Sequence, residues 1–182
     1  MYFESPITAI FSTYEVAIDA LRVTARAIER QDGDLVVTTG FSGTSPSESS
    51  NALQSARDQI EDLAVLAMWA AFERYIIEQI QNRQSRLATT HPPEFARSLA
   101  KKFAQSVERW PVGEILDLFK KEVGDDLLRS TQAIKKYRDW VAHRNPKKAP
   151  PPRTDPSHTF DVLSSVVAKI HEAHTVTQAW GD

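Results

Sequence analysis

The sequence contains no cysteine among its 182 residues and no long hydrophobic run. Without cysteine the chain can form neither disulfides nor thiolate zinc sites, and a cysteine nucleophile is excluded. The absence suits a reducing compartment. The longest apolar run, Leu63–Phe72, would span about 15 Å as a helix, half of what a bilayer requires. The N-terminus lacks the basic and apolar regions of a secretory signal. We therefore expect no membrane association and a cytoplasmic location.

An excess of one charge is also missing. The 22 Lys and Arg residues nearly balance the 24 Asp and Glu residues, for a formal net charge of −2. No global electrostatic attraction to nucleic acid follows from such a balance. Any basic surface must therefore be local.

Several signatures of catalysis are absent as well. There is no glycine-rich phosphate loop, and no carboxylate pair is spaced for a two-metal nuclease. The "GFSG" stretch at 40–43 lacks the last glycine of a nucleophile elbow, because Thr44 stands there, and is expected to be loop. His171 and His174 are three residues apart rather than the four of zinc proteases, and no third ligand is signalled. We expect a solvated helix face there, no metal and no cofactor.

What the sequence does contain is helical periodicity. Apolar residues recur every three or four positions, and Gly, Pro or Ser separates the segments. The pattern predicts an all-α bundle of five or six helices in one domain, residues 1–182. The helices are expected at about 8–30, 51–86, 94–110, 113–123, 127–144 and 160–180.

Two long connections are predicted between these helices. A flexible loop is expected at about 32–50, with Ser49 or Ser50 as N-cap of the next helix. A Pro/Lys-rich loop is expected at about 145–157. The fifth helix, which precedes this loop, is expected to have Asp125 or Asp126 as its N-cap. The second helix is apolar nearly all round in its middle, which predicts a place at the bundle centre or in a subunit interface.

Basic residues gather at the end of the fifth helix. From Lys135 to Arg153 there are seven basic residues and one acid, so this segment carries +6 and the rest of the chain −8. Such polarisation is typical of a basic patch that contacts phosphates. Lys and Arg also gather at helix C-termini because of the dipole, but that does not account for those beyond Pro146. The predicted RNA contacts are Lys135, Arg144, Lys147 and Lys148.

The same helix end carries "RDWVAH", Arg138 to His143. Arg138 and His143, five residues apart, would point about 140° apart on an ideal helix, with a rise of about 7.5 Å. Asp139 and His143 are four apart and share a face, so they can hydrogen-bond or pair. An imidazole beside a permanent cation suits proton transfer at a phosphate, and a guanidinium donates bidentate hydrogen bonds to phosphoryl oxygens.

"RDWVAH" resembles the R-x4–6-H motif of the HEPN superfamily, with a polar residue after the arginine. HEPN domains are all-α bundles of four to five helices with the motif on a late helix, where this one falls. The stretch "AMWAAFERYIIEQI" on the second helix is also similar to the corresponding HEPN helix, including Phe72 and Glu73. The resemblance extends over the helical pattern of most of the chain.

The resemblance implies metal-independent cleavage of RNA, in many members as toxins or antiviral effectors. Arg138 and His143 would be the catalytic pair, with Asp139 at the polar position. We expect Glu73 to pair with Arg138 and fix its rotamer; the alternative is a plain surface carboxylate. A homodimer with a composite active site is also implied. Because Arg144 and Asn145 follow the histidine, silencing through a modified tyrosine by a partner nucleotidyltransferase is not favoured.

Two other readings stay open. Some HEPN domains are non-catalytic modules that bind a nucleotide or protein partner, or that dimerise. The chain could also be an antitoxin-like or scaffold subunit of a defence operon. The intact Arg138–His143 pair favours the ribonuclease, acting with or without a cognate antitoxin, because a purely structural module does not need both residues.

Overall fold

The computed structural model describes residues 5–30, 32–82, 87–144 and 147–179, and over these residues the chain is all-α. The predicted fold class is confirmed. The described residues form the helices α1 (Thr8–Glu29), α2 (Gly33–Val36), α3 (Pro46–Gln81), α5 (Pro93–Val107), α6 (Val112–Leu118), α7 (Lys120–Val123), α8 (Asp125–His143) and α9 (Pro156–Ala179). Among them, none combines the length and apolar character needed to cross a membrane.

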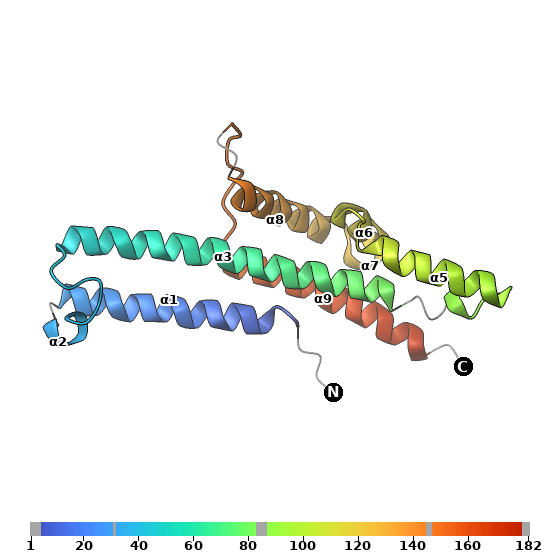
Figure 1. Cartoon of the computed structure of the whole chain (residues 1–182), viewed down its shortest axis with the longest axis horizontal. Helices are drawn as coiled ribbons and strands as arrows, with labels where there is room; N and C mark the ends of the chain where they lie inside the picture. Colours follow the sequence, from blue (N-terminus) through green and yellow to red (C-terminus); the bar gives the residue numbers. More distant parts are fainter. Residues whose placement is uncertain (1–4, 31, 83–86, 145–146, 180–182) are drawn as a thin grey trace.

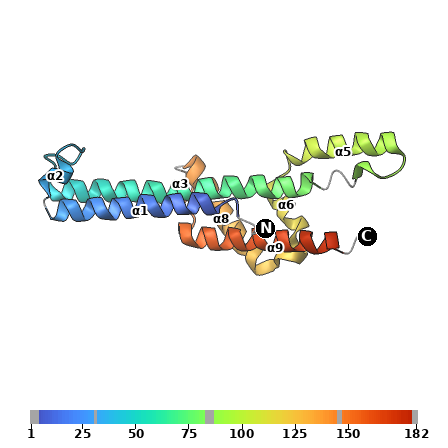
Figure 2. The same ribbon diagram turned by 90° about the horizontal axis from the view of Figure 1, so that it is seen from below.

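Helix α3 is the axis of the molecule, with 36 residues and a length of about 54 Å. Helix α1 lies antiparallel beside its first half, whereas α8 and α9 lie along its second half (Figures 1 and 2). The first half of α3 and α1 therefore form a two-helix hairpin that extends beyond the bundle (Figure 1). We call this the α1/α3 hairpin.

The core surrounds the second half of α3. All but one of the buried residues on this helix lie between Ala64 and Ile80. Trp69 and Phe72 are completely buried there, with ring centroids 5.5 Å apart. Helix α9 faces them with four fully buried aliphatic side chains, Leu163, Val166, Val167 and Ile170. The prediction that the long second helix occupies the bundle centre is confirmed for this half.

The start of α3 differs from the prediction. The helix begins at Pro46 rather than near residue 51, and its N-cap is Ser45, not Ser49 or Ser50. The Ser45 hydroxyl accepts a hydrogen bond from the Glu48 backbone, while the Glu48 carboxylate accepts one from the Ser45 backbone. This capping box, with proline in the first turn, stabilises the helix start. Ser49 is instead buried.

Other boundaries also shift. The predicted loop at 32–50 contains α2 and the first turn of α3. The segment 113–123 is divided at Phe119 into α6 and α7, and α8 has Gly124 as its N-cap, with a φ of 89°. Helix α9 begins at Pro156, which shortens the Pro/Lys-rich loop; residues 145 and 146 of that loop lie outside the described part of the chain.

Candidate functional site at the end of helix α8

Helix α8 presents the motif by packing one face on α3. Ile134, Tyr137 and Val141 are buried and recur every three or four residues, so they form the contact stripe of α8. The residues that flank this stripe, Arg138 and Asp139, lie at the edge of the α3–α8 contact and are half-buried. The burial pattern therefore sets where the motif side chains emerge.

Three neighbours hold the Arg138 guanidinium. Its Nη2 donates a hydrogen bond of 2.7 Å to Glu73 Oε2 on α3, and its Nη1 donates one of 3.0 Å to Asp139 Oδ1. The guanidinium also lies over the Trp69 ring, 5.5 Å from the centroid, within cation–π range. The predicted Glu73–Arg138 pair is present. The Arg138 side chain is 25% exposed, which leaves one side of it open to solvent.

Asp139 pairs with cations rather than with the histidine. Lys135 Nζ donates a hydrogen bond of 2.6 Å to Asp139 Oδ2, while Arg138 holds the other oxygen. Burial alone raises the pKa of Asp139, but the hydrogen bonds and charges of Lys135 and Arg138 outweigh it, so the pKa is lowered. The predicted Asp139–His143 contact is not formed, because Lys135 occupies the carboxylate from the preceding turn.

His143 is the last residue of α8 and its imidazole is exposed. Since α8 is a continuous α-helix from Arg138 to His143, the two side chains point about 140° apart along it. Within one chain the pair thus forms no closed site.

The chain leaves α8 through a left-handed residue. Arg144 has φ 38° and ψ 48°, a conformation that residues other than glycine and asparagine rarely adopt. Its guanidinium donates a hydrogen bond of 2.7 Å to Asp62 Oδ2, and the Tyr137 hydroxyl donates one of 2.6 Å to the other oxygen. This ion pair turns the Arg144 side chain back onto α3.

Tyr137 is fixed in its neutral form by the same contact. Burial raises its pKa to about 12, and the hydrogen bond to the Asp62 carboxylate adds to the rise. The buried phenol and the carboxylate thus link α8 to α3 directly beneath the motif.

Arg153 makes a second link to α3. It donates hydrogen bonds of 3.1 Å to Asp58 and 2.9 Å to Glu61. Together with Asp62 and Glu73, four carboxylates of α3 reduce the +6 charge of the segment 135–153 to +2. The predicted basic patch is therefore largely neutralised in the free chain. Of the three cations beyond Pro146, Arg153 pairs with α3, and Lys147 and Lys148 lie in an exposed loop.

The remaining predicted RNA contacts lie further out. Lys147 and Lys148 are exposed in the loop after α8. A polar groove of about 400 Å³ lies along α3 next to Arg144. Asn51, Gln54, Ser55, Asp58, Gln59 and Asp62 line its α3 side.

Several of these partners could not be identified from the sequence. The sequence does contain the signal for an acidic stripe, because the spacing places three carboxylates on one face of α3: Asp58, Glu61 and Asp62. Two of its cationic partners, Arg144 and Arg153, are more than 80 positions away in the chain, and no local pattern reveals them. Trp69 is buried beneath Arg138, and nothing in the sequence indicates this contact except the place of Trp69 in the apolar run.

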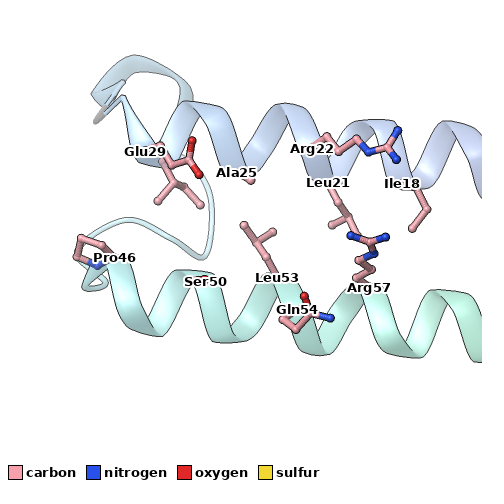
Figure 3. Close-up of a pocket in the computed structure, with 11 residues that line it drawn as sticks. Ile18, Leu21, Arg22, Ala25, Glu29, Pro46, Ser50, Leu53, Gln54 and Arg57 are labelled. Carbon is pink, nitrogen blue, oxygen red and sulfur yellow. The ribbon is translucent and has the colours of Figure 1, made fainter.

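A cavity of about 240 Å³ lies elsewhere, at the α2 end of the α1/α3 hairpin. Leu21 and Ile18 of α1 point toward α3, Leu53 points back, and Arg57 closes one side (Figure 3). No motif residue lines this cavity. No group of three or more His, Asp or Glu side chains suited to a metal ion occurs among the described residues.

No family model matches the chain, and no curated protein or solved structure is significantly similar to it. The resemblance to HEPN domains thus rests on the motif, its place on α8 and the helical pattern.

Proposed function

We propose that the chain is a metal-independent endoribonuclease of the HEPN type that acts on RNA in the cytoplasm as a toxin or defence effector. The observation that carries this proposal is the way in which hydrogen bonds hold the Arg138 guanidinium. Its guanidinium has five N–H donors, of which Glu73 and Asp139 use two. The other three are available to a phosphate, and the guanidinium is held in place before the substrate arrives.

In the proposed reaction His143 takes the proton from a ribose 2′-OH. The 2′-oxygen attacks the adjacent phosphorus, the bond between phosphorus and the 5′-oxygen breaks, and the 5′-oxygen takes a proton from an imidazolium. The products are a 2′,3′-cyclic phosphate and a 5′-OH end. Arg138 stabilises the negative charge that develops on the phosphoryl oxygens. Glu73 and Asp139 act as positioning residues, because they touch the arginine and not the RNA.

The reaction benefits from an acid and a base on opposite sides of the phosphorus. One chain offers a single histidine at this helix end, and it points away from Arg138. As part of the proposal, the active species is a homodimer in which both copies contribute Arg138, Asp139 and His143 to one cleft. A cognate antitoxin is the class of protein that would restrain it, whereas a partner nucleotidyltransferase is not favoured, because Arg144 and Asn145 stand after the histidine.

A second candidate is a non-catalytic module that binds a nucleotide or a protein partner. The neutralisation of the basic segment by α3 carboxylates favours this candidate, since it reduces the attraction to RNA. The two functions are separated by cleavage assays on the purified chain with Arg138→Ala and His143→Ala variants. Loss of cleavage in both, with unchanged helical circular dichroism, supports the nuclease. Equal cleavage by the parent and His143→Ala contradicts it.

A further inference from the structure

The cavity of about 240 Å³ in the α1/α3 hairpin has apolar walls along its middle. Leu21, Ala25 and Ile28 of α1 face Leu53 of α3 across it. All four side chains are only half-buried, although they lie between the two helices, because the cavity leaves open space beside each of them. We call this the hairpin cavity. It provides an apolar environment for a ligand of small cross-section.

Two guanidiniums stand at the end of the hairpin cavity that is nearer to the bundle. Arg57 of α3 and Arg22 of α1 both lie at the Ile18 end (Figure 3). Burial raises the pKa of Tyr14, one turn before Ile18, and the charges of Arg57 and Arg22 act in the opposite direction. Both guanidiniums are therefore within electrostatic range of the same phenol, which makes this end of the cavity suitable for an anion.

Arg57 keeps most of its hydrogen-bond donors for a ligand. Its Nε donates a hydrogen bond of 2.9 Å to Glu61 Oε1, and its side chain is 48% exposed. The four N–H groups on its two terminal nitrogens have no hydrogen-bond partner among the described residues. The other oxygen of Glu61 accepts a hydrogen bond from Arg153, so Arg57 shares this carboxylate with a second guanidinium. The planar fork of free N–H groups matches the two oxygens of a ligand carboxylate.

We propose that the hairpin cavity binds a medium-chain aliphatic carboxylate, with octanoate as the representative ligand. The ligand carboxylate accepts two hydrogen bonds from Arg57 beside the charge of Arg22, and the alkyl chain lies between Leu21 and Leu53. This inference does not depend on the proposed nuclease, because no residue of the motif lines the cavity.

The dimensions of the cavity fit a chain of about eight carbons. From Arg57 back to Ser50 helix α3 rises about 10.5 Å, which is close to the length of an extended chain of about eight carbons. At about 30 Å³ for each water-sized group, the cavity volume of about 240 Å³ holds about eight non-hydrogen atoms. Length and volume thus indicate the same size of ligand.

The other end of the cavity selects against a second charge on the ligand. Glu29 and Pro46 stand there, away from the two guanidiniums (Figure 3). Glu29 has no ion-pair partner among the described residues, so its negative charge repels a carboxylate at the far end of the ligand. A dicarboxylate of the same length should therefore bind less tightly than octanoate. An amine in place of the carboxylate should be repelled by Arg57 and Arg22.

Isothermal titration calorimetry of the full chain tests the ligand class. We expect one octanoate per chain, with an affinity that rises up to about fourfold for each methylene from butanoate to octanoate. Octanol, octylamine and octanedioate should each bind at least tenfold more weakly than octanoate, because each loses the charged hydrogen bonds or adds a repulsion. Absence of octanoate binding, equal binding of octanol or octylamine, or an affinity that does not rise with chain length overturns the proposal.

Two variants test the place of binding in the same assay. Arg57→Gln should weaken octanoate binding at least tenfold. Arg74→Gln is the matched control, because Arg74 also pairs with a glutamate of α3 and is 53% exposed but does not line the cavity, and it should bind octanoate as the parent does. If Arg57→Gln does not fold, Ala25→Leu serves in its place: it fills the cavity, leaves both guanidiniums and should abolish binding. Binding equal to the parent in either cavity variant, or an equal loss in Arg74→Gln, contradicts the assignment.

Discussion

Substitution of Glu73 by glutamine removes the charge that holds Arg138 and nearly preserves the shape of the side chain. The two side chains are 29% and 25% exposed, between the buried and the fully exposed case. Hydrogen bonds to buried charges contribute about 1.5–3 kcal/mol, and exposed ion pairs about 0.2–1 kcal/mol. We therefore expect Glu73→Gln to lower the free energy of unfolding by about 1–1.5 kcal/mol. For a chain of this size that corresponds to a fall in Tm of about 2–6 °C.

Glu78→Gln provides the control on the same helix. Glu78 also pairs with an arginine, Arg74, at 2.7 Å, but the two side chains are 49% and 53% exposed. Loss of the Arg74–Glu78 pair should lower the free energy of unfolding by less than about 0.5 kcal/mol. Thermal melts followed by circular dichroism measure both variants. A double-mutant cycle of Glu73→Gln with Arg138→Gln isolates the pair from other effects of each change.

The two variants should also differ in RNA cleavage. Misplacement of a catalytic group by about 1 Å can cost a hundredfold in rate, so we expect Glu73→Gln to lower kcat at least tenfold, with Glu78→Gln unchanged. Equal Tm values for the two variants would show that the Glu73 contact contributes no more than a surface pair. Normal cleavage by a destabilised Glu73→Gln variant would show that Glu73 does not position Arg138 for catalysis.

Three further changes test the electrostatics of the site. Because the pKa of Asp139 is lowered in the folded chain, its stabilising contribution exists above the ordinary value of 3.8 and is lost as the pH falls through the folded value. Asp139→Asn should thus unfold at a lower urea concentration than the parent at pH 7, and this difference in stability should disappear in acid. Asp62→Asn frees Arg144 from its carboxylate and should tighten RNA binding measured by fluorescence anisotropy; weaker or equal binding would mean that Arg144 does not face RNA. The double change of Lys147 and Lys148 to alanine should weaken RNA binding and reduce the salt slope by about 1.4, at about 0.7 for each single-strand phosphate contact.

Local sequence patterns predict most of the fold. The apolar spacing identifies every long helix, because one buried face is enough to specify it. The start of α3 was within reach as well: Ser45 and Glu48 form a capping box and Pro46 stands in the first turn. The Ser- and Thr-rich context obscured that signal, since the same residues are typical of loops.

The candidate site is predictable only in part. The Glu73–Arg138 pair was expected because Glu73 directly follows the apolar run of the second helix. The predicted contact between Asp139 and His143 is not formed. Lys135, four residues before Asp139, binds the same carboxylate instead. The basic segment gave a local charge of +6, but the Asp58 and Asp62 pairs that offset it join residues far apart in the chain. Long-range charge pairing depends on packing, which no local pattern contains.

The most direct test of the central claim is the chemistry of the RNA ends made by the purified chain in excess EDTA. The account predicts that cleavage persists in the chelator and leaves 2′,3′-cyclic phosphate and 5′-OH ends, and that both disappear in His143→Ala. Cleavage that stops in EDTA and returns with magnesium or manganese would contradict it, as would 5′-phosphate ends.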